Sequence, residues 1–224
     1  MKFKIGVDVG GTFTDFLLSR ADGTFRAYKV LSTPKDPSIA TMRGISEMAQ
    51  DEGMSLKEFL TSVEVIVHGT TVTTNAVLTY RGARTGLLTT EGVRDALEMR
   101  RGIREEQYNN RYANVVPLVP RYLRLPVAGR LDYAGNEITP LDEDRVRTQA
   151  EQMRDEGAEA IAICFMNSFA NRDHEDRAAQ ICREIIPDAY LSVSIDVLPS
   201  IRFYDRVSTT VLNAYVGPIL KRYL

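Results

Sequence analysis

A short polar stretch near the amino terminus combines glycines with hydroxyl side chains. Residues 5–15 read IGVDVGGTFTD, so that an apolar run is followed by Gly10, Gly11, Thr12 and Thr14. Because glycine lacks a Cβ, a phosphate can approach the backbone N–H groups of such a turn, and the threonine hydroxyls add further donors. We expect these four residues to bind the phosphates of a ligand. A Gly-Gly pair between two strands is equally typical of a plain hairpin turn, and the residues alone leave that alternative open.

An acid precedes this turn. Asp8 would lie beside a bound phosphate, where two negative charges repel each other unless a hard cation bridges them, usually through water. Asp8 therefore predicts a bound Mg²⁺. The stretch matches neither the GxxxxGK[ST] phosphate loop nor the GxGxxG dinucleotide motif, because no lysine follows the glycines and their spacing differs.

A second polar stretch, HGTTVTTN, begins at His68 and follows the apolar run 63–67. The run of β-branched residues predicts a strand that is buried on both faces. Ligands of open α/β sheets bind beyond the carboxyl ends of such strands, and an imidazole titrates near neutrality. We therefore expect His68, Thr70 and Thr71 to act on the ligand, with His68 as acid, base or hydrogen-bond donor. The alternatives are that His68 only orients the loop and that a threonine only caps the next helix.

The residues around these stretches predict the elements that position them. Phe3, Ile5, Val7 and Val9 alternate with other residues as in a half-buried strand. The next expected elements are strands over 15–19 and 25–31, a hairpin turn at 22–23 and a helix that Ser38 caps. The first three strands would be antiparallel, which places the glycine turn at one end of their sheet.

Later in the chain, helical patterns alternate with buried strands, which makes α/β the predicted class. The run 158–166 predicts a parallel strand, and Cys164 within it, like Cys182 in a helical pattern, is expected to be a buried free thiol. Asn167 and Ser168 follow that strand, so they are secondary candidates for substrate contact. Capping of the strand end is the alternative for both.

Composition narrows the class of protein. The chain has 224 residues, 44% hydrophobic and 26% charged, with a net charge of −2, which argues against nucleic acid as a partner. No apolar run approaches the roughly 18 residues of a membrane helix, and the first residues lead into a strand rather than a signal peptide. Together with the free thiols, these features predict a cytoplasmic protein that makes no membrane contact.

Four motifs in this order resemble the hydantoinase A and 5-oxoprolinase family. They are VDVGGTFTD at 7–15, HGTTVTTNAVL at 68–78, RGARTGLLTTEGVRD at 81–95 and YDRVSTTVLNAYVGP at 204–218. The opening pattern of strand, DxGGT turn, strand, tight turn and strand also resembles the start of the actin-like ATPases. Two further strings, GIREEQYNNRY and LVPRYLRLPV, look more like the acetone and acetophenone carboxylase branch.

The resemblance implies a fold and an activity. The implied fold is an actin-like (ribonuclease H-like) ATPase lobe over residues 1–200, with a mixed sheet that opens with three antiparallel strands and has helices on both faces. The implied cofactors are ATP and Mg²⁺. The implied reaction is phosphorylation of an amide or carbonyl oxygen in a small-molecule substrate, which drives lactam opening or ketone carboxylation.

The resemblance also implies partners. Residues 201–224 would form a helix leading toward a second lobe, with Arg206, Ser208 and Thr209 facing the cleft. Because the family continues beyond Leu224, we expect this lobe to need other subunits or a second half for activity. One alternative is a non-catalytic docking subunit that keeps the lobe's fold. Another is a phosphotransferase of the sugar-kinase type.

An arginine-rich stretch is the least ordinary part of the sequence. Arg100, Arg101 and Arg104 could clamp an anionic substrate or bicarbonate, because guanidinium offers a planar fork of donors. A solvated face or a contact between subunits is the alternative for these residues. The segment 109–126, which lacks clear periodicity, is expected to be an insertion that touches another chain.

Overall fold

The computed structural model describes residues 2–33, 36–103 and 105–223. The chain divides into two compact units, one formed by residues 1–81 with 219–224 and one by residues 82–218. We call them unit 1 and unit 2. The predicted division into a lobe over 1–200 and a helix over 201–224 stays a prediction, because two compact units can belong to one lobe. None of the described helices is both long and apolar enough to cross a bilayer.

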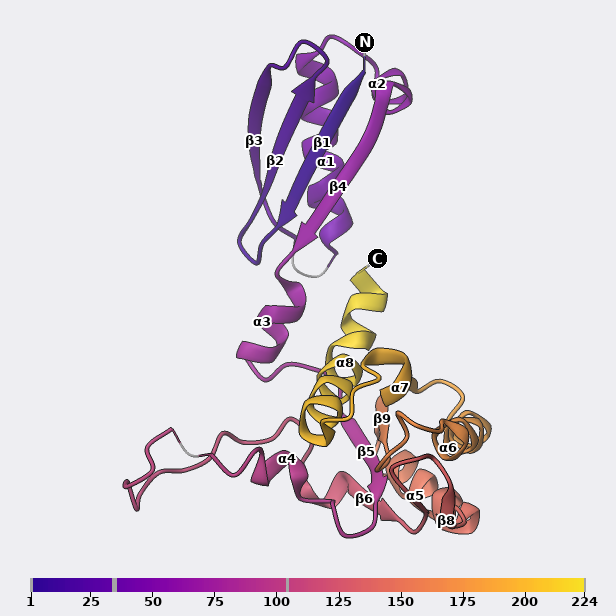
Figure 1. The fold of residues 1–224 in the computed structure, drawn as a ribbon. Helices are drawn as coiled ribbons and strands as arrows, with labels where there is room; N and C mark the ends of the chain where they lie inside the picture. The colour runs from indigo at the N-terminus through magenta and orange to yellow at the C-terminus, as the bar shows by residue number, and fades with distance from the viewer. Residues whose placement is uncertain (1, 34–35, 104, 224) are drawn as a thin grey trace. The chain divides into compact units, whose positions relative to one another are not determined.

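Unit 1 opens with the three antiparallel strands that the sequence predicts. Its sheet has the order β3-β2-β1-β4, in which β4 pairs parallel to β1 (Figure 1). The bounds are β1 (Phe3–Val9), β2 (Phe13–Arg20), β3 (Phe25–Leu31) and β4 (Val63–Thr70). The glycine turn joins β1 to β2 and therefore lies at one end of the sheet, as expected.

Helices α1 (Pro37–Asp51) and α2 (Leu56–Ser62) pack on one face of this sheet. The alternating apolar residues of β1 are buried in the core that these helices cover, and the Phe3 and Phe59 rings lie 5.1 Å apart between centroids. The opposite face carries exposed side chains such as Lys4, Asp8 and Leu17. The cap of α1 is Asp36 rather than the predicted Ser38, because the Asp36 carboxylate accepts from the backbone N–H of Ser38.

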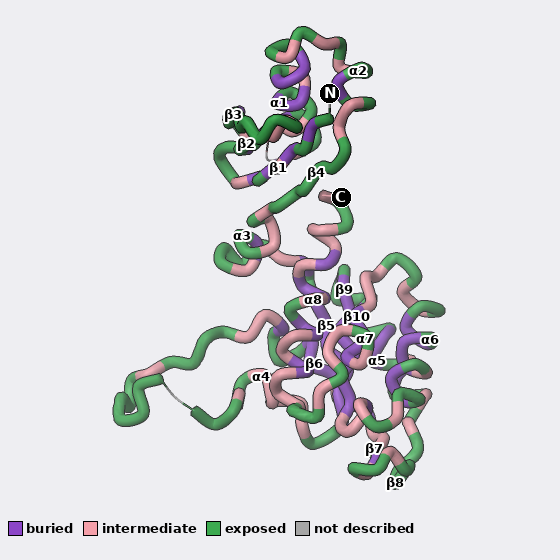
Figure 2. Tube along the Cα trace, turned by 45° about the horizontal axis from the view of Figure 1, so that its top comes forward, coloured by how far each residue is buried: buried purple, intermediate pink, exposed green. Residues whose placement is uncertain are grey.

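The prediction that residues 63–67 are buried on both faces is wrong. Val65, Ile66 and Val67 are 42%, 44% and 65% exposed, and β4 is drawn as exposed along most of its length in Figure 2. The strand lies at the edge of its sheet, and no described strand pairs with its outer side. A β-branched run favours a strand, but burial also requires neighbouring layers, and the described residues do not supply them.

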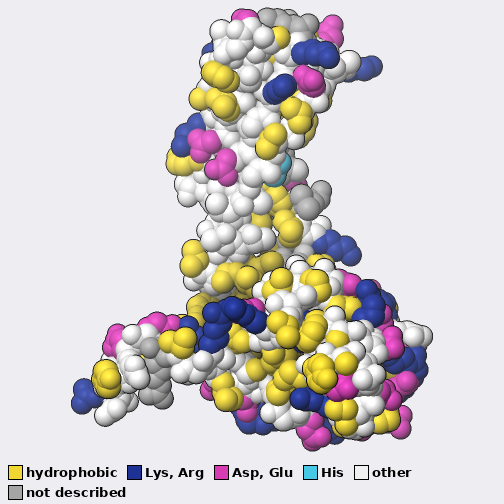
Figure 3. All heavy atoms as spheres, in the orientation of Figure 1, with side chains coloured by type: hydrophobic (Ala, Val, Ile, Leu, Met, Phe, Trp, Pro, Cys, Tyr) yellow, Lys and Arg dark blue, Asp and Glu magenta, His cyan; other side chains and the backbone are white. Residues whose placement is uncertain are grey.

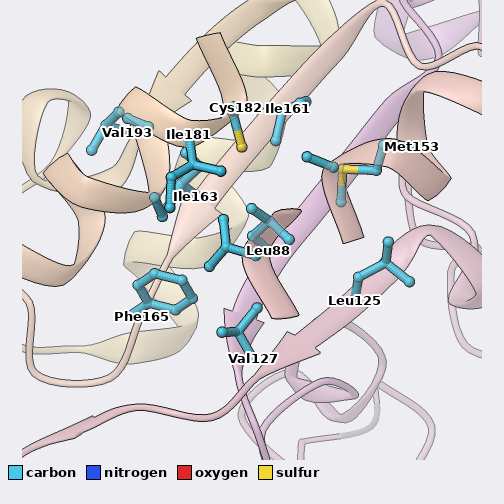
Figure 4. Packing of buried hydrophobic residues seen from close by; sticks show 14 of the residues in the cluster. Leu88, Leu125, Val127, Met153, Ile161, Ile163, Phe165, Ile181, Cys182 and Val193 are labelled. Carbon is cyan, nitrogen blue, oxygen red and sulfur yellow. The ribbon is translucent and has the colours of Figure 1, made fainter. Parts of the chain in front are cut away.

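Unit 2 is built on an all-parallel sheet of order β10-β9-β5-β6. Alternate residues of β9 enter two separate cores, with Ile161 and Ile163 facing α5 and α6 (Figure 4) and Ala162 and Cys164 facing α8. Helices therefore cover both faces, which confirms the α/β class. The bounds are β5 (Thr85–Thr90), β6 (Arg124–Val127), β9 (Ala160–Cys164), β10 (Tyr190–Val193), α5 (Glu143–Asp155), α6 (Asp173–Ile185) and α8 (Phe203–Tyr223).

Both cysteines are buried and free, as predicted. The smaller elements of unit 2 are α4 (Ala96–Met99), η1 (Arg121–Leu123), β7 (Arg130–Leu131), β8 (Glu137–Thr139) and α7 (Ser194–Val197). Residues 109–120 form neither helix nor strand, which agrees with the predicted irregular segment 109–126, but that prediction is wrong for its last residues, which form η1 and most of β6. The contact of this segment with another chain stays a prediction.

The arginine-rich stretch pairs with acids of unit 2. Arg100 contacts both carboxylate oxygens of Glu105, and Arg101 contacts Asp205. These two guanidinium groups therefore already have anionic partners, which favours the surface interpretation over the predicted clamp. Arg104 lies outside the described residues. Acidic and basic side chains are interspersed on the face that Figure 3 presents.

Candidate functional site

Hydrogen bonds fix the conformation of the glycine turn. The N–H of Gly10 donates to the Phe13 carbonyl at 3.0 Å, and the Gly10 carbonyl accepts from the Ser32 hydroxyl at 2.8 Å. A Cβ on Gly10 would lie 2.9 Å from the Phe13 oxygen, so that the turn needs glycine there. Within the described chain the N–H groups of Gly11 and Thr12 have no hydrogen-bond partner, which leaves two donors for an anion.

Thr14 does not contribute a free hydroxyl to this turn. The residue is fully buried, and its Oγ1 lies 3.0 Å from the Ser32 Oγ. Because side chains alternate along a strand, Thr14 points into the core of unit 1, while Thr12 precedes β2 and is exposed. The prediction that Thr14 contacts phosphate is thus corrected: Thr14 supports Ser32, which in turn holds the glycine turn.

Thr70 and Thr71 lie against the glycine turn, as expected from the parallel pairing of β1 and β4. Thr70 is the register partner of Val9, and its hydroxyl donates to the Val9 carbonyl at 3.3 Å. The Thr70 hydroxyl oxygen also accepts from the N–H of Val72 at 3.1 Å, at the start of α3 (Val72–Leu78). Thr71 N–H donates to the Val9 carbonyl at 3.4 Å. The two predicted stretches, distant in sequence, therefore meet at the carboxyl ends of β1 and β4.

A cavity of about 480 Å³ opens at this meeting point, within unit 1. Of the predicted site residues, Gly10, Gly11 and Thr70 line it. No aspartate or glutamate is among the described residues that form its wall. The remaining lining residues are Val9, Ser32, Thr33, Pro37, Val72, Asn75, Ala76, Thr79, Arg81, Ile219 and Tyr223. We call this cavity the turn pocket.

His68 lies beside the turn pocket rather than in its wall. It is the register partner of Val7 on β4, and its Nε2 forms a hydrogen bond with the hydroxyl of Tyr223, which does line the pocket. The two rings pack at 5.4 Å between centroids. His68 is thus connected to the pocket through Tyr223, a contact that the sequence did not predict.

Asp8 lies on the other face of the sheet. Residues of β1 alternate, so that Val7 and Val9 face α1 while Asp8 is exposed on the opposite side, next to Gly69 of β4. A Cβ on Gly69 would lie 3.8 Å from Asp8 Oδ1, in ordinary van der Waals contact. One accessible carboxylate with room for water suits Mg²⁺, which keeps much of its hydration shell. The described residues hold no cluster of three metal-binding side chains.

Sequence reasoning missed several residues of the turn pocket. Asn75 donates from Nδ2 to the Thr71 hydroxyl at 3.2 Å, and a Cβ on Gly11 would lie 3.7 Å from the same Nδ2. Asn75 stands within the HGTTVTTNAVL motif, four residues after Thr71, and that spacing places both on one side of a helical turn. Arg81 opens the next motif. No signal in the sequence indicated Tyr223.

Unit 2 contains the other expected residues, of which Ser168 and Arg206 are buried. Ser168 is buried, and its hydroxyl donates to the Phe165 carbonyl at 2.8 Å, which agrees with capping of the strand end. Arg206 is fully buried and pairs with Glu175, so it does not face an open cleft as predicted. Ser208 and Thr209 bond to the Asp205 carbonyl within α8. A separate cavity of about 560 Å³ in unit 2 is lined by none of the predicted catalytic, nucleotide-binding or metal-binding residues.

Comparison with known proteins gives a consistent picture. The model of the hydantoinase/oxoprolinase N-terminal region matches residues 4–186. The chain is 38% identical to the caprolactamase subunit alpha of Pseudomonas jessenii, over all of this chain and 32% of that protein. It is also 38% identical to the acetophenone carboxylase gamma subunit of Aromatoleum aromaticum, over 95% of this chain and 31% of that protein.

Two solved structures share the fold. The ATP-dependent caprolactamase of Pseudomonas jessenii aligns with a TM-score of 0.89 at 39% identity, over 98% of this chain and 32% of that one. A nucleotide-free acetone carboxylase aligns with a TM-score of 0.89 at 30% identity, over 97% of this chain and 32% of that one. The chain thus spans about a third of the length of these relatives.

Proposed function

Because the chain belongs to the hydantoinase/oxoprolinase family, we propose that it is part of an ATP-dependent enzyme that activates an amide or carbonyl compound. Its fold is the α/β, actin-like ATPase lobe predicted from the motifs. The relatives include a caprolactamase and a ketone carboxylase subunit, so that the proposed reactions are opening of a cyclic amide or carboxylation of a ketone. In both reactions, phosphorylation of the substrate oxygen would make the substrate a better electrophile or enol donor.

The proposed site is the glycine turn with the polar stretch that follows β4. Gly10 and Gly11 bring the backbone close to the ATP phosphates, and the N–H groups of Gly11 and Thr12 donate to them. Asp8 would hold Mg²⁺, which supplies charge neutralisation at the phosphates. Phosphoryl transfer asks the protein mainly for placement and neutralisation, and a site of backbone donors meets that demand.

His68, Thr70 and Thr71 are the proposed residues for the phosphoryl acceptor. Thr70 lines the turn pocket, and Thr71 is the next residue and bonds to the same Val9 carbonyl as Thr70. His68, fixed by Tyr223, would orient the acceptor oxygen and exchange a proton with it. The acceptor is a small molecule, and we propose that other subunits or a second lobe complete its binding site. We place this assembly in the cytoplasm, where free thiols such as those of Cys164 and Cys182 persist.

The observation that carries this proposal is the turn pocket, which Gly10, Gly11 and Thr70 share and whose described wall contains no acid. Isothermal titration with ATP and Mg²⁺, before and after addition of the chains that co-purify with this protein, tests it. We expect binding that weakens at least about tenfold in Asp8→Asn, because the metal loses its carboxylate. The matched control is Asp51→Asn, since Asp51 is the last residue of α1 and its carboxylate already pairs with Arg26 at 2.7 Å. Equal affinities for the wild type and Asp8→Asn contradict the assignment of Asp8.

A docking subunit without catalysis is the second candidate, and exposed β4 favours it. An edge strand with apolar Val65, Ile66 and Val67 on its surface is suited to pair with another chain. This candidate predicts no binding of ATP with or without partner chains. The same titration therefore separates the two functions.

A further inference from the structure

The turn pocket has an unbalanced charge. Among the described residues that line it, Arg81 is the one with a charge at neutral pH. No described carboxylate lies within salt-bridge distance of its guanidinium. By contrast, Arg84, three residues later, pairs with Glu156 at 3.0 Å. The pocket therefore presents a positive charge without an internal counterion, which favours an anionic ligand.

The backbone before Arg81 is held in an unusual conformation. Helix α3 ends with the N–H of Tyr80 donating to the Val77 carbonyl at 3.2 Å and the N–H of Arg81 donating to the Ala76 carbonyl at 2.9 Å. This pattern is a Schellman motif, whose left-handed position is usually glycine. Here it is Tyr80, with φ of 54°. Tyrosine is disfavoured in that conformation, and the turn it completes directs the chain so that Arg81 lines the pocket.

Several neutral donors surround the same space. The side-chain amide of Asn75 lies beside Gly11, and the unpaired N–H groups of Gly11 and Thr12 belong to the adjoining turn. Ser32, Thr79 and Tyr223 also line the pocket, where their hydroxyls bond to the Gly10 carbonyl, the Asn75 carbonyl and His68. A phosphate has several acceptor oxygens, so a guanidinium, an amide and two unpaired backbone N–H groups, with no acid among the described lining residues, suit phosphate better than a cation or an apolar molecule.

We infer that Arg81 is a phosphate-binding residue and that the turn pocket takes the polyphosphate part of its ligand. The inference rests on the proposed function only in naming ATP as the source of the phosphates. It assigns the phosphates to the carboxyl ends of β1 and β4, where Val9 and Thr70 are register partners. Asn75 contributes a second side-chain contact.

Titration of the full protein, together with any co-purifying chains, tests the inference with two probes. The probes are ATP with Mg²⁺ and inorganic pyrophosphate without metal. We expect Arg81→Gln to weaken both at least about tenfold and Arg81→Lys to weaken them less, because an ammonium keeps the charge and loses the planar fork. Arg43→Gln is the matched control, since Arg43 is an exposed arginine of α1 outside the pocket wall. It should bind both probes like the wild type.

A second variant distinguishes the effect of the Arg81 guanidinium on affinity from the effect of the turn at Tyr80. Glycine accepts the Tyr80 conformation, so Tyr80→Gly should melt no lower than the wild type and keep both affinities within about twofold. If Tyr80→Gly loses as much affinity as Arg81→Gln, the effect comes from the loop and the inference is overturned.

The outcomes distinguish this inference from the proposed function. If Mg²⁺·ATP binds equally to the wild type and Arg81→Gln, the role of Arg81 is refuted and the ATPase proposal stands. If pyrophosphate binds in an Arg81-dependent way while ATP does not bind, the inference holds and the ATPase proposal fails. Binding of neither probe to the wild type overturns the inference.

Discussion

The imidazole of His68 and the hydroxyl of Tyr223 form a hydrogen bond although 155 positions separate the two residues. His68 lies near the carboxyl end of β4, and Tyr223 is the last residue of α8. Both belong to unit 1. The end of the last helix thus fixes the orientation of the candidate catalytic imidazole, which an isolated strand end would leave free to rotate.

Tyr223→Phe removes the hydroxyl and leaves the ring packing. We expect the ¹⁵N chemical shifts of the His68 ring to move, because the nitrogen that faces Tyr223 loses its partner. We also expect turnover by the complete enzyme to fall about tenfold while ATP affinity changes less than about twofold. NMR of the imidazole nitrogens and steady-state kinetics measure the two effects. Tyr122→Phe, which removes a hydroxyl that contacts Arg84 instead, should change neither. Unchanged His68 shifts in Tyr223→Phe would refute the positioning role.

The two glycines of the turn should respond differently to alanine. A Cβ on Gly10 would lie 2.9 Å from a backbone oxygen, whereas one on Gly11 would lie 3.7 Å from the flexible Asn75 amide. We expect Gly10→Ala to lower the free energy of unfolding by about 1–3 kcal/mol. Gly11→Ala should leave stability within about 0.5 kcal/mol and weaken ATP binding, because the methyl group occupies the approach of the phosphate. Chemical denaturation and titration calorimetry check the pair. Equal destabilisation by both substitutions would contradict the geometry.

The two thiols should be inert in the native protein. Burial raises the pKa of Cys164 to about 12 and that of Cys182 to about 12, against an ordinary value of 9.0. At pH 8 almost no thiolate is present, so a thiol reagent should label neither residue natively and both in denaturant. Because the unfolded thiols ionise near pH 9 and the native ones near 12, the free energy of unfolding should fall as pH rises between these values. Native labelling within minutes at pH 8 would show that one thiol is accessible.

The interior of unit 2 depends on a buried ion pair. Arg206 and Glu175 are both fully buried, with Nη1 and Oε1 3.4 Å apart, and Ser194 donates to the same carboxylate oxygen at 2.6 Å. Glu175→Gln leaves the guanidinium without its counterion, which we expect to cost about 3–5 kcal/mol. At roughly 2–4 °C per kcal/mol for a chain of this size, the melting temperature should fall about 10 °C.

Asp176→Asn is the matched control for this substitution. Asp176 is the neighbouring acid of α6, but its partner Arg172 is exposed, so that the loss should stay below about 1 kcal/mol. Thermal unfolding followed by circular dichroism compares the two variants. A smaller effect of Glu175→Gln than of Asp176→Asn would show that the buried pair contributes little.

The local sequence pattern was sufficient to predict the strands and the turn that carry the candidate site. Alternation in residues 3–9 predicted β1 with its buried set, and the Asp22-Gly23 turn predicted the hairpin, where Gly23 has φ of 83°. The β-branched run before His68 predicted a strand, and its pairing with β1 brings Thr70 to the glycine turn. These features depend on residues close in sequence, whose side-chain period and backbone preferences are set locally.

The faces of those elements were decided only by the tertiary structure. Thr14 was predicted to contact phosphate, but strand register turns it into the core, and the same alternation separates Asp8 from His68. β4 is exposed because burial depends on which layers lie against a strand. Tyr223 meets His68 within unit 1 although the two are far apart in sequence, and Arg81 enters the pocket wall through the turn at Tyr80. Contacts between distant residues follow from packing, and no local pattern in the chain encodes them.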